Sequence, residues 1–259
     1  MPNVLTGVNP LTRLAVIILV TTPLLLSVDW VSAAVSLVIT LLCAPLCGVS
    51  WWRLLKMSWP LIIIAPISGI SMLLYAQEGG REYFSFFLAT VTDNSIELAV
   101  AMMLRVLAVA LPVIVLARDI DPTELGDALA QILKLPARFV IGAVAGVRML
   151  TLFKDDWQAM GQARRARGLA DRGRISHLLT MTFGLLVLAL RRGGKLATAM
   201  EARGFGRPIS TSPRTWARES KLVRTDWIIM AIGVLLASLP VIISVVSGYW
   251  RFLGLKIRL

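Results

Sequence analysis

Charged residues are scarce in this sequence. Only 16% of the 259 residues are charged, whereas an ordinary soluble domain has about 25%. The hydrophobic share is 57% and the mean hydropathy is +0.76. Because so few charges cannot cover the surface of a water-soluble globule, that class of protein is excluded. The composition indicates a chain embedded in a lipid bilayer.

Cysteine and histidine are also rare, with two cysteines and one histidine in the chain. Cys43 and Cys47 lie inside an apolar run, so we interpret them as packing residues; the chain cannot build a disulfide scaffold or a four-ligand zinc site. Asp155 and Asp156 could suggest a metal-binding pair, but an aspartate-rich prenyl-transfer motif needs a further acid three residues on, where Ala159 stands. We therefore interpret the two aspartates, beside Lys154, as a charged turn. We expect neither a metal site nor catalytic residues in this chain.

A phosphate-binding loop is missing as well. Gly193-Gly194-Lys195 is followed by Leu196 and lacks the glycine that such a loop has five residues before its second glycine. This chain therefore cannot hydrolyse ATP unaided. No small-residue cleavage site follows the first apolar run, so we expect that run to be retained as a membrane segment.

Long apolar runs are what the chain does contain. A helix needs roughly 20 mainly apolar residues to cross the hydrocarbon core. Several prolines fall inside the runs, and membrane helices tolerate them with kinks. Five windows meet this criterion: Leu11–Val28, Val31–Val49, Met57–Ala76, Ile96–Ala117 and Trp227–Gly248.

Two further apolar windows decide the architecture. Leu178–Leu190 has 13 residues, and letting it cross would place the nine basic residues of 191–224 outside. Leu135–Phe153 is long enough but carries Arg138 and Arg148, each of which costs about 2.5–3.5 kcal/mol at mid-bilayer. We expect both windows to form helices at or just inside the membrane interface.

The distribution of basic residues predicts sidedness. Residues 118–224 hold 19 Lys and Arg against nine Asp and Glu, which places them in the cytoplasm by the positive-inside rule. The sequence thus predicts an all-α integral membrane protein with about five transmembrane helices. Its expected parts are a four-span bundle (1–117), a cytoplasmic-side segment of interfacial helices (118–224), and a final helix with a tail (225–259).

The cytoplasmic-side segment opens with a helix-start pattern. Asp121 can cap, Pro122 suits the first helical position and Glu124 completes a capping box, which predicts a surface helix against the bundle. Further on, Gly142 and Gly146 are four residues apart in an apolar helix. Small residues at this spacing let two helix backbones approach closely, so we expect a second helix to cross there.

Arg105 lies in the middle of the fourth span, where an ionisable side chain usually faces protein or water. It could form a functional ion site, or it could tie its helix to the backbone carbonyls of a neighbour. We favour the second interpretation, because Glu97 is about 12 Å away along the same helix and is a poor partner.

The most specific signal is a repeated tripeptide. It reads Ala166-Arg167-Gly168 and recurs 36 residues later as Ala202-Arg203-Gly204. Each copy ends a helical pattern, and glycine after the cap adopts the left-handed conformation without a steric penalty. An apolar residue follows each copy, and we expect Phe205 to fold back toward Met200. The pattern predicts two glycine-capped helix C-termini.

Capping alone does not require Ala-Arg before the glycine twice. Two rigid helix ends that each present an arginine suit carboxylates at two places on a partner. At the second copy, we expect the neighbouring residues Glu201 and Phe205 to support binding of the partner. The first copy has additional positive charge, which fits anionic lipid headgroups as well as protein. This charge comes from Arg164, Arg165, Arg172 and Arg174.

In their settings QARRARGL (from Gln162) and AMEARGFG (from Ala199), the paired motifs resemble the transmembrane T component of energy-coupling factor (ECF) transporters, the CbiQ-type family. The similarity covers most of the chain, and Arg105 also falls where such sequences place it. In Asn9-Pro10-Leu11-Thr12-Arg13, Asn9 replaces the His or Asp usual before the proline. Further matching segments are Asp121-Pro122-Thr123-Glu124-Leu125 and Leu135-Pro136.

The resemblance implies a transporter subunit in a prokaryotic cell membrane. In this family, cytoplasmic coupling helices end in the Ala-Arg-Gly motifs, which bind two ABC-type ATPases, and apolar helix faces hold a substrate-binding S component. ATP and magnesium would then be bound by the partner ATPases, and this chain would have no cofactor. Vitamin and metal-ion uptake both fit the family.

Two other functions compete with this interpretation. A conventional ABC importer permease also contacts ATPases through a cytoplasmic helix, but it normally uses one such helix per subunit and works as a pair. A membrane-embedded transferase needs clustered acids or a nucleophile with a base, which this chain lacks. Nucleic-acid binding is not expected, because the basic segment lies between spans without interleaved aromatic residues, and nearby anionic lipid explains its charge.

Overall fold

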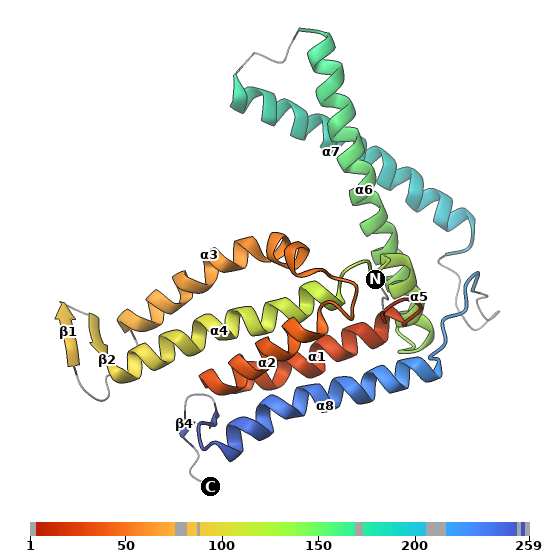
Figure 1. Ribbon diagram of the computed structural model, residues 1–259. Helices are drawn as coiled ribbons and strands as arrows, with labels where there is room; N and C mark the ends of the chain where they lie inside the picture. Colours follow the sequence, from red (N-terminus) through yellow and green to blue (C-terminus); the bar gives the residue numbers. More distant parts are fainter. Residues whose placement is uncertain are drawn as a thin grey trace. The chain divides into compact units, whose positions relative to one another are not determined.

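The structure is a computed structural model that describes residues 4–75, 82–86, 89–168, 173–205, 216–252 and 255–256. Within these ranges the chain forms helices and two small antiparallel hairpins (Figure 1). The predicted all-α fold is confirmed. The helices are α1 (Pro10–Leu26), α2 (Trp30–Cys43), α3 (Trp51–Tyr75), α4 (Asp93–Leu116), α5 (Pro122–Gln131), α6 (Ala137–Ala166), α7 (Arg174–Ala202) and α8 (Arg224–Val246). The strands are β1 (Glu82–Phe86), β2 (Ala89–Thr92), β3 (Arg251–Phe252) and β4 (Leu255–Lys256).

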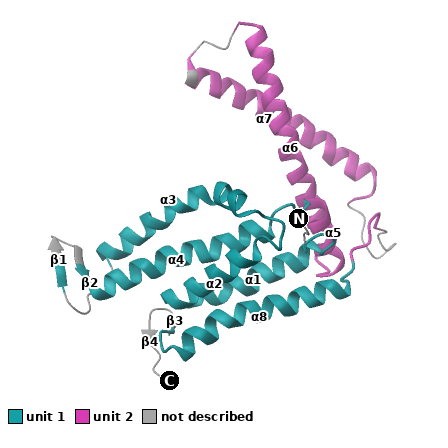
Figure 2. Ribbon diagram, in the orientation of Figure 1, with its two compact units in different colours: residues 1–121, 221–259 teal, residues 122–220 magenta. Residues whose placement is uncertain are grey.

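The chain divides into two compact units (Figure 2). The first, which we call the bundle unit, comprises residues 1–121 and 221–259. The second, which we call the arm unit, comprises residues 122–220 and contains α5, α6 and α7. Both motif copies therefore belong to the arm unit.

The bundle unit buries small side chains and exposes large apolar ones. On α3, Ile63 and Ile67 are 52% and 61% exposed, and Ile228 on α8 is 58% exposed. Helices in lipid associate through close packing of small residues, whereas bulky aliphatic residues face the hydrocarbon. This arrangement identifies an integral membrane protein. The buried small residues include Ala33, Ser36, Thr40, Ser58, Ala65, Ala99, Ala108 and Ser244.

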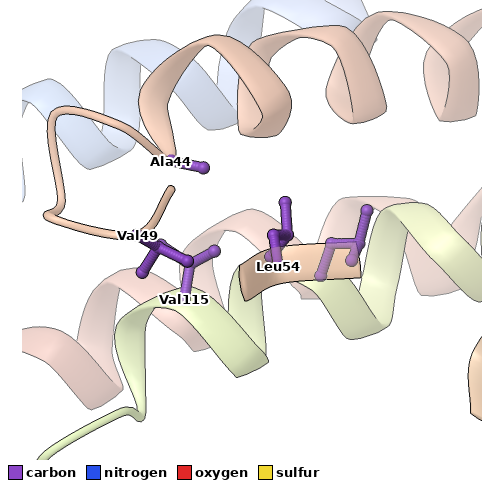
Figure 3. Packing of buried hydrophobic residues seen from close by; sticks show 5 residues of the cluster. Ala44, Val49, Leu54 and Val115 are labelled. Atoms are coloured by element: carbon purple, nitrogen blue, oxygen red, sulfur yellow. The ribbon is translucent and has the colours of Figure 1, made fainter. Parts of the chain in front are cut away.

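Helix α4 lies at the centre of the bundle unit, in contact with α1, α2 and α3, while α8 packs on α1 and α2. At one end of α4, Val115 packs with Ala44 and Val49 from the connection between α2 and α3, and with Leu54 at the start of α3 (Figure 3). This cluster fixes the tight connection that follows α2.

Two polar contacts join distant ends of the bundle unit. Asp226, which is only 1% exposed, accepts a hydrogen bond from the backbone N–H of Asn9 at 2.9 Å and another from that of Val223 at 2.7 Å. Arg13 donates to the carbonyls of Arg118 and Leu5. The start of α1 is thereby tied to the start of α8 and to the end of α4.

The neighbour expected for Arg105 is present. Its guanidinium donates to the Leu25 carbonyl near the end of α1, so the predicted tie to a backbone carbonyl is confirmed. Asp29, which no sequence pattern singled out, is the buried N-cap of α2. Its carboxylate accepts from the Ser32 N–H at 2.7 Å and from the Ser244 hydroxyl at 2.5 Å, which links α2 to α8.

The lengths of the helices correct three expectations. By length and composition four helical segments can cross a membrane within the described residues: α3, α4, α8 and Ile175–Ala202 of α7. A short helix over 178–190 was therefore the wrong interpretation, because the basic residues after it continue the helix. The window expected over 135–153 likewise continues to the end of α6 at Ala166. Helices α1 and α2 have 17 and 14 residues, and α2 ends at Cys43 rather than Val49.

Candidate functional site

The second motif copy ends α7 with a complete glycine cap. Ala202 is the last helical residue, and Gly204 has a φ of +77°. The Gly204 N–H donates to the Glu201 carbonyl at 2.9 Å, and the Phe205 N–H donates to the Met200 carbonyl at 3.0 Å. This pair of bonds is the Schellman motif. The backbone at Phe205 thus returns to Met200 in the last turn, as predicted.

The first copy ends α6 with a glycine in the same conformation. Ala166 is the last helical residue, and Gly168 has a φ of +66°. The Gly168 N–H donates to the Arg165 carbonyl at 3.0 Å, and the Arg167 N–H donates to the Ala163 carbonyl at 3.2 Å. Leu169 and Arg172, singled out in the sequence, lie outside the described residues. The predicted glycine cap is confirmed at both helix ends.

The two motif arginines are exposed. Arg167 and Arg203 are the C-cap residues of α6 and α7, and no salt bridge joins either of them to an acid in the described ranges. Each arginine stands on a helix end whose backbone is fixed by the cap, so the Cα of the arginine has a defined position. We call the two helix ends, residues 164–168 and 201–205, the first tip and the second tip.

The tips differ in charge. The first tip carries three arginines within four residues, Arg164, Arg165 and Arg167. Arg164 is half-buried and Arg165 is exposed. The second tip has one acid, Glu201, and one base, Arg203, both exposed. The formal charge is thus +3 on the first tip and zero on the second.

Helices α6 and α7 meet well before their tips. The Arg192 guanidinium of α7 contacts the Asp156 carboxylate of α6 through two N–O pairs, at 2.6 and 2.9 Å. Asp156 is therefore not part of a charged turn, as the sequence suggested, but lies inside α6. A methyl group in place of a Gly184 hydrogen would lie 3.4 Å from the Met160 sulfur, which shows how closely the helices approach.

The helix crossing expected at Gly142 and Gly146 is not found there. Apart from the adjoining backbone of α6 itself, no atom of the described residues lies within 4 Å of where a Cβ would stand on either glycine. Another small residue, Gly126 of α5, makes the close approach in this part of α6: a Cβ on it would lie 2.3 Å from the Val144 side chain. Among the described residues, Gly142 and Gly146 face open space, and α6 meets α7 further along, at Gly161.

Helix α5 also holds the chain that returns from α7. The Gln131 side chain donates to the Arg218 carbonyl at 2.8 Å and accepts from the Ser220 N–H at 2.9 Å. Arg218 in turn pairs with Glu124 at 2.7 Å. These contacts, which the sequence analysis did not anticipate, bring the beginning and the end of the arm unit together on one short helix.

The cap geometry gives a direct prediction. Gly204→Ala is expected to weaken the second tip by about 1–2 kcal/mol, because a side chain is strained in the left-handed region. Hydrogen exchange at the Phe205 amide should then be about five- to thirty-fold faster. Gly194→Ala, inside α7 with open space around it, makes the same chemical change and should not accelerate exchange there. Equal exchange in the two variants would contradict the assigned cap.

The fold and the tips together define a multi-pass helical membrane protein with two capped, arginine-bearing helix ends. The family model of CbiQ, the cobalt transport protein, matches residues 1–215. The chain belongs to this family, so the resemblance drawn from the paired motifs is confirmed. It is a transport subunit rather than an enzyme.

Curated relatives agree with this assignment. Three of them bear the name energy-coupling factor transporter transmembrane protein EcfT. The protein from Brevibacillus brevis is 25% identical over 255 residues, which is 94% of this chain and 92% of that protein. The one from Limosilactobacillus fermentum is 26% identical over 201 residues, covering 71% and 74%. The one from Exiguobacterium sibiricum is 26% identical over 196 residues, covering 70% and 73%.

Proposed function

We propose that this chain is the energy-coupling subunit of an ECF-type importer in a prokaryotic cell membrane. Arg167 and Arg203 each bind one subunit of a pair of ABC-type ATPases on the cytoplasmic side. ATP-driven closure of that pair shifts α6 and α7, and this movement reorients a membrane-embedded S component that carries a micronutrient, either a vitamin or a metal ion. ATP and magnesium are bound by the ATPases.

The observation that carries the proposal is the pair of capped tips in one arm unit. Each tip presents an exposed arginine on a fixed backbone, and guanidinium groups bind carboxylates with two parallel hydrogen bonds. Although the tips differ in net charge, each offers one exposed arginine on a capped helix end, which suits a partner with two acidic sockets. We assign the supporting residues Arg164, Arg165, Glu201 and Phe205 to these tips as well.

The sidedness proposal depends on charge. The arm unit and its flanks, residues 118–224, contain 19 of the 27 basic residues of the chain. The positive-inside rule favours the cytoplasm for such a segment, and we place α7 there on that ground although it is long and apolar enough to cross. The first tip, with its excess of arginines, also suits anionic lipid headgroups at the inner surface. The S component would bind the exposed apolar faces of the helices, which offer it packing without charge.

Native mass spectrometry of the complex purified after co-expression with the ATPases and the S component tests the proposal. We expect one copy of this chain with two ATPase subunits, because one chain supplies both tips. Two copies of this chain with two ATPases would instead indicate a conventional ABC importer permease. The third possibility, a membrane-embedded transferase, predicts no bound ATPase at all.

A further inference from the structure

The ion pair between Asp156 and Arg192 lies at the same distance from both tips. Asp156 precedes Arg167 by 11 residues, and Arg192 precedes Arg203 by 11 residues. At about 1.5 Å per residue, each tip is roughly 16 Å from the ion pair along its own helix. Counted from this ion pair, equal lengths of helix lead to the two arginines, although the contact between the helices extends to Gly161 and Met181.

The same spacing sets the direction in which the arginines point. Eleven residues make about three turns at 3.6 residues per turn, so residues that far apart lie on nearly the same face of a helix. Arg167 therefore follows the face of α6 that bears Asp156, and Arg203 follows the face of α7 that bears Arg192. The orientation of both tips is linked to the contact between the helices.

The other contacts at the crossing are adaptable. Met160 of α6 lies over Gly184 of α7, and Met181 of α7 lies over Gly161 of α6. Methionine is unbranched and flexible, and glycine offers no side chain that could interlock with it. These contacts allow the crossing angle to change, whereas the charged pair, with its short contacts of 2.6 and 2.9 Å, holds one point of each helix in place.

We call residues 156–167 at the end of α6 and 192–203 at the end of α7 the two arms. We propose that Asp156 and Arg192 are a positioning pair that acts as the pivot of these arms. The pair holds the crossing point while the methionine–glycine contacts let the angle vary. A displacement at one tip is thereby transmitted to the other arm, because the ion pair keeps α6 and α7 from sliding along one another. The pivot follows from the arm unit itself, and its role in transport rests on the proposed function above.

Distance measurement between spin labels tests the pivot. Labels at Gln162→Cys and Thr198→Cys, two exposed positions on the arms, would be placed in a chain with Cys43→Ala and Cys47→Ala. We expect Asp156→Ala to broaden the distance distribution about two-fold, because the arms can slide. Asp155→Ala removes the same charge from an exposed neighbour and should leave the width unchanged.

Exchanging the two charges provides a second comparison in the same experiment. Asp156→Arg combined with Arg192→Asp should restore the narrow distribution, and Asp156→Glu, which keeps the charge, should be narrower than Asp156→Ala. Equal widths for Asp155→Ala and Asp156→Ala would overturn the pivot. The pivot would also be overturned if the charge-exchange variant folds and both it and Asp156→Glu keep the broad distance distribution of Asp156→Ala.

A transport readout separates this inference from the proposed function. In the reconstituted complex, Asp156→Ala should retain both ATPases but lower substrate uptake per ATP hydrolysed by about five-fold, and the charge exchange should recover most of it. An unchanged uptake ratio would refute the role in coupling. If the wild-type chain binds no ATPase, the proposed function fails, while the label distances still decide whether the pair is a pivot.

Discussion

Replacing Arg167 and Arg203 together by glutamate is expected to remove the ATPase subunits from the purified complex and to reduce ATP-driven uptake to background. Each substitution turns an attraction to an acidic socket into a repulsion. Loss of one partner of a hydrogen-bonded charge pair at an interface costs about 2–5 kcal/mol, which is a factor of about thirty or more in affinity for each tip. Pull-down of the ATPases and uptake into proteoliposomes measure the two effects.

The matched control is Arg148→Glu combined with Arg191→Glu. Both arginines are exposed on the same two helices but lie away from the tips, and the net charge changes by the same amount. We expect this control to retain the ATPases. Each single tip substitution should give an intermediate loss. A full yield of complex from the double tip variant, or equal losses from the tip and control variants, would refute the assignment of the tips.

Asp226→Ala is expected to cause a large loss of stability in the bundle unit. The substitution leaves the backbone N–H groups of Asn9 and Val223 without their acceptor, and each unsatisfied buried group costs about 1–3 kcal/mol. The start of α1 should separate from the start of α8 at a lower temperature. Thermal unfolding of the purified protein in detergent measures the effect.

Two aspartate-to-asparagine variants, one at the same position and one at an exposed control position, test this prediction further. Asp226→Asn keeps one acceptor oxygen and should lose about half as much stability as Asp226→Ala. Asp119→Asn removes one acidic charge from a side chain that is 71% exposed, and asparagine tolerates the positive φ at that position. It should leave the unfolding temperature unchanged. If Asp226→Ala unfolds at the same temperature as Asp119→Asn, the buried carboxylate does not join the two helices.

Features that depend on neighbouring residues could be predicted from the sequence. The glycine caps after Arg167 and Arg203 need only a helix that ends and a residue that can adopt a positive φ, and both caps are found as expected. The apolar windows likewise located the helices of the bundle unit. The function assigned to the tips stays a prediction, because it depends on partner surfaces rather than on the caps.

Features that depend on distant residues could not be predicted. Asn9 and Asp226 are 217 positions apart, and no local pattern connects them. Asp156 was interpreted as part of a turn because its partner, Arg192, is supplied by another helix. The extent of α7 was misjudged for a related reason: hydropathy marks where a helix is apolar, whereas arginine and lysine continue a helix without difficulty.

The attachment of the returning chain to α5 has a mechanical consequence. The arm unit joins the rest of the polypeptide at two places, before Pro122 and after Ser220. Pro122 begins α5, and Ser220 is hydrogen-bonded to Gln131 on the last turn of that helix. Both covalent connections of the arm unit to the rest of the chain therefore start from one ten-residue helix.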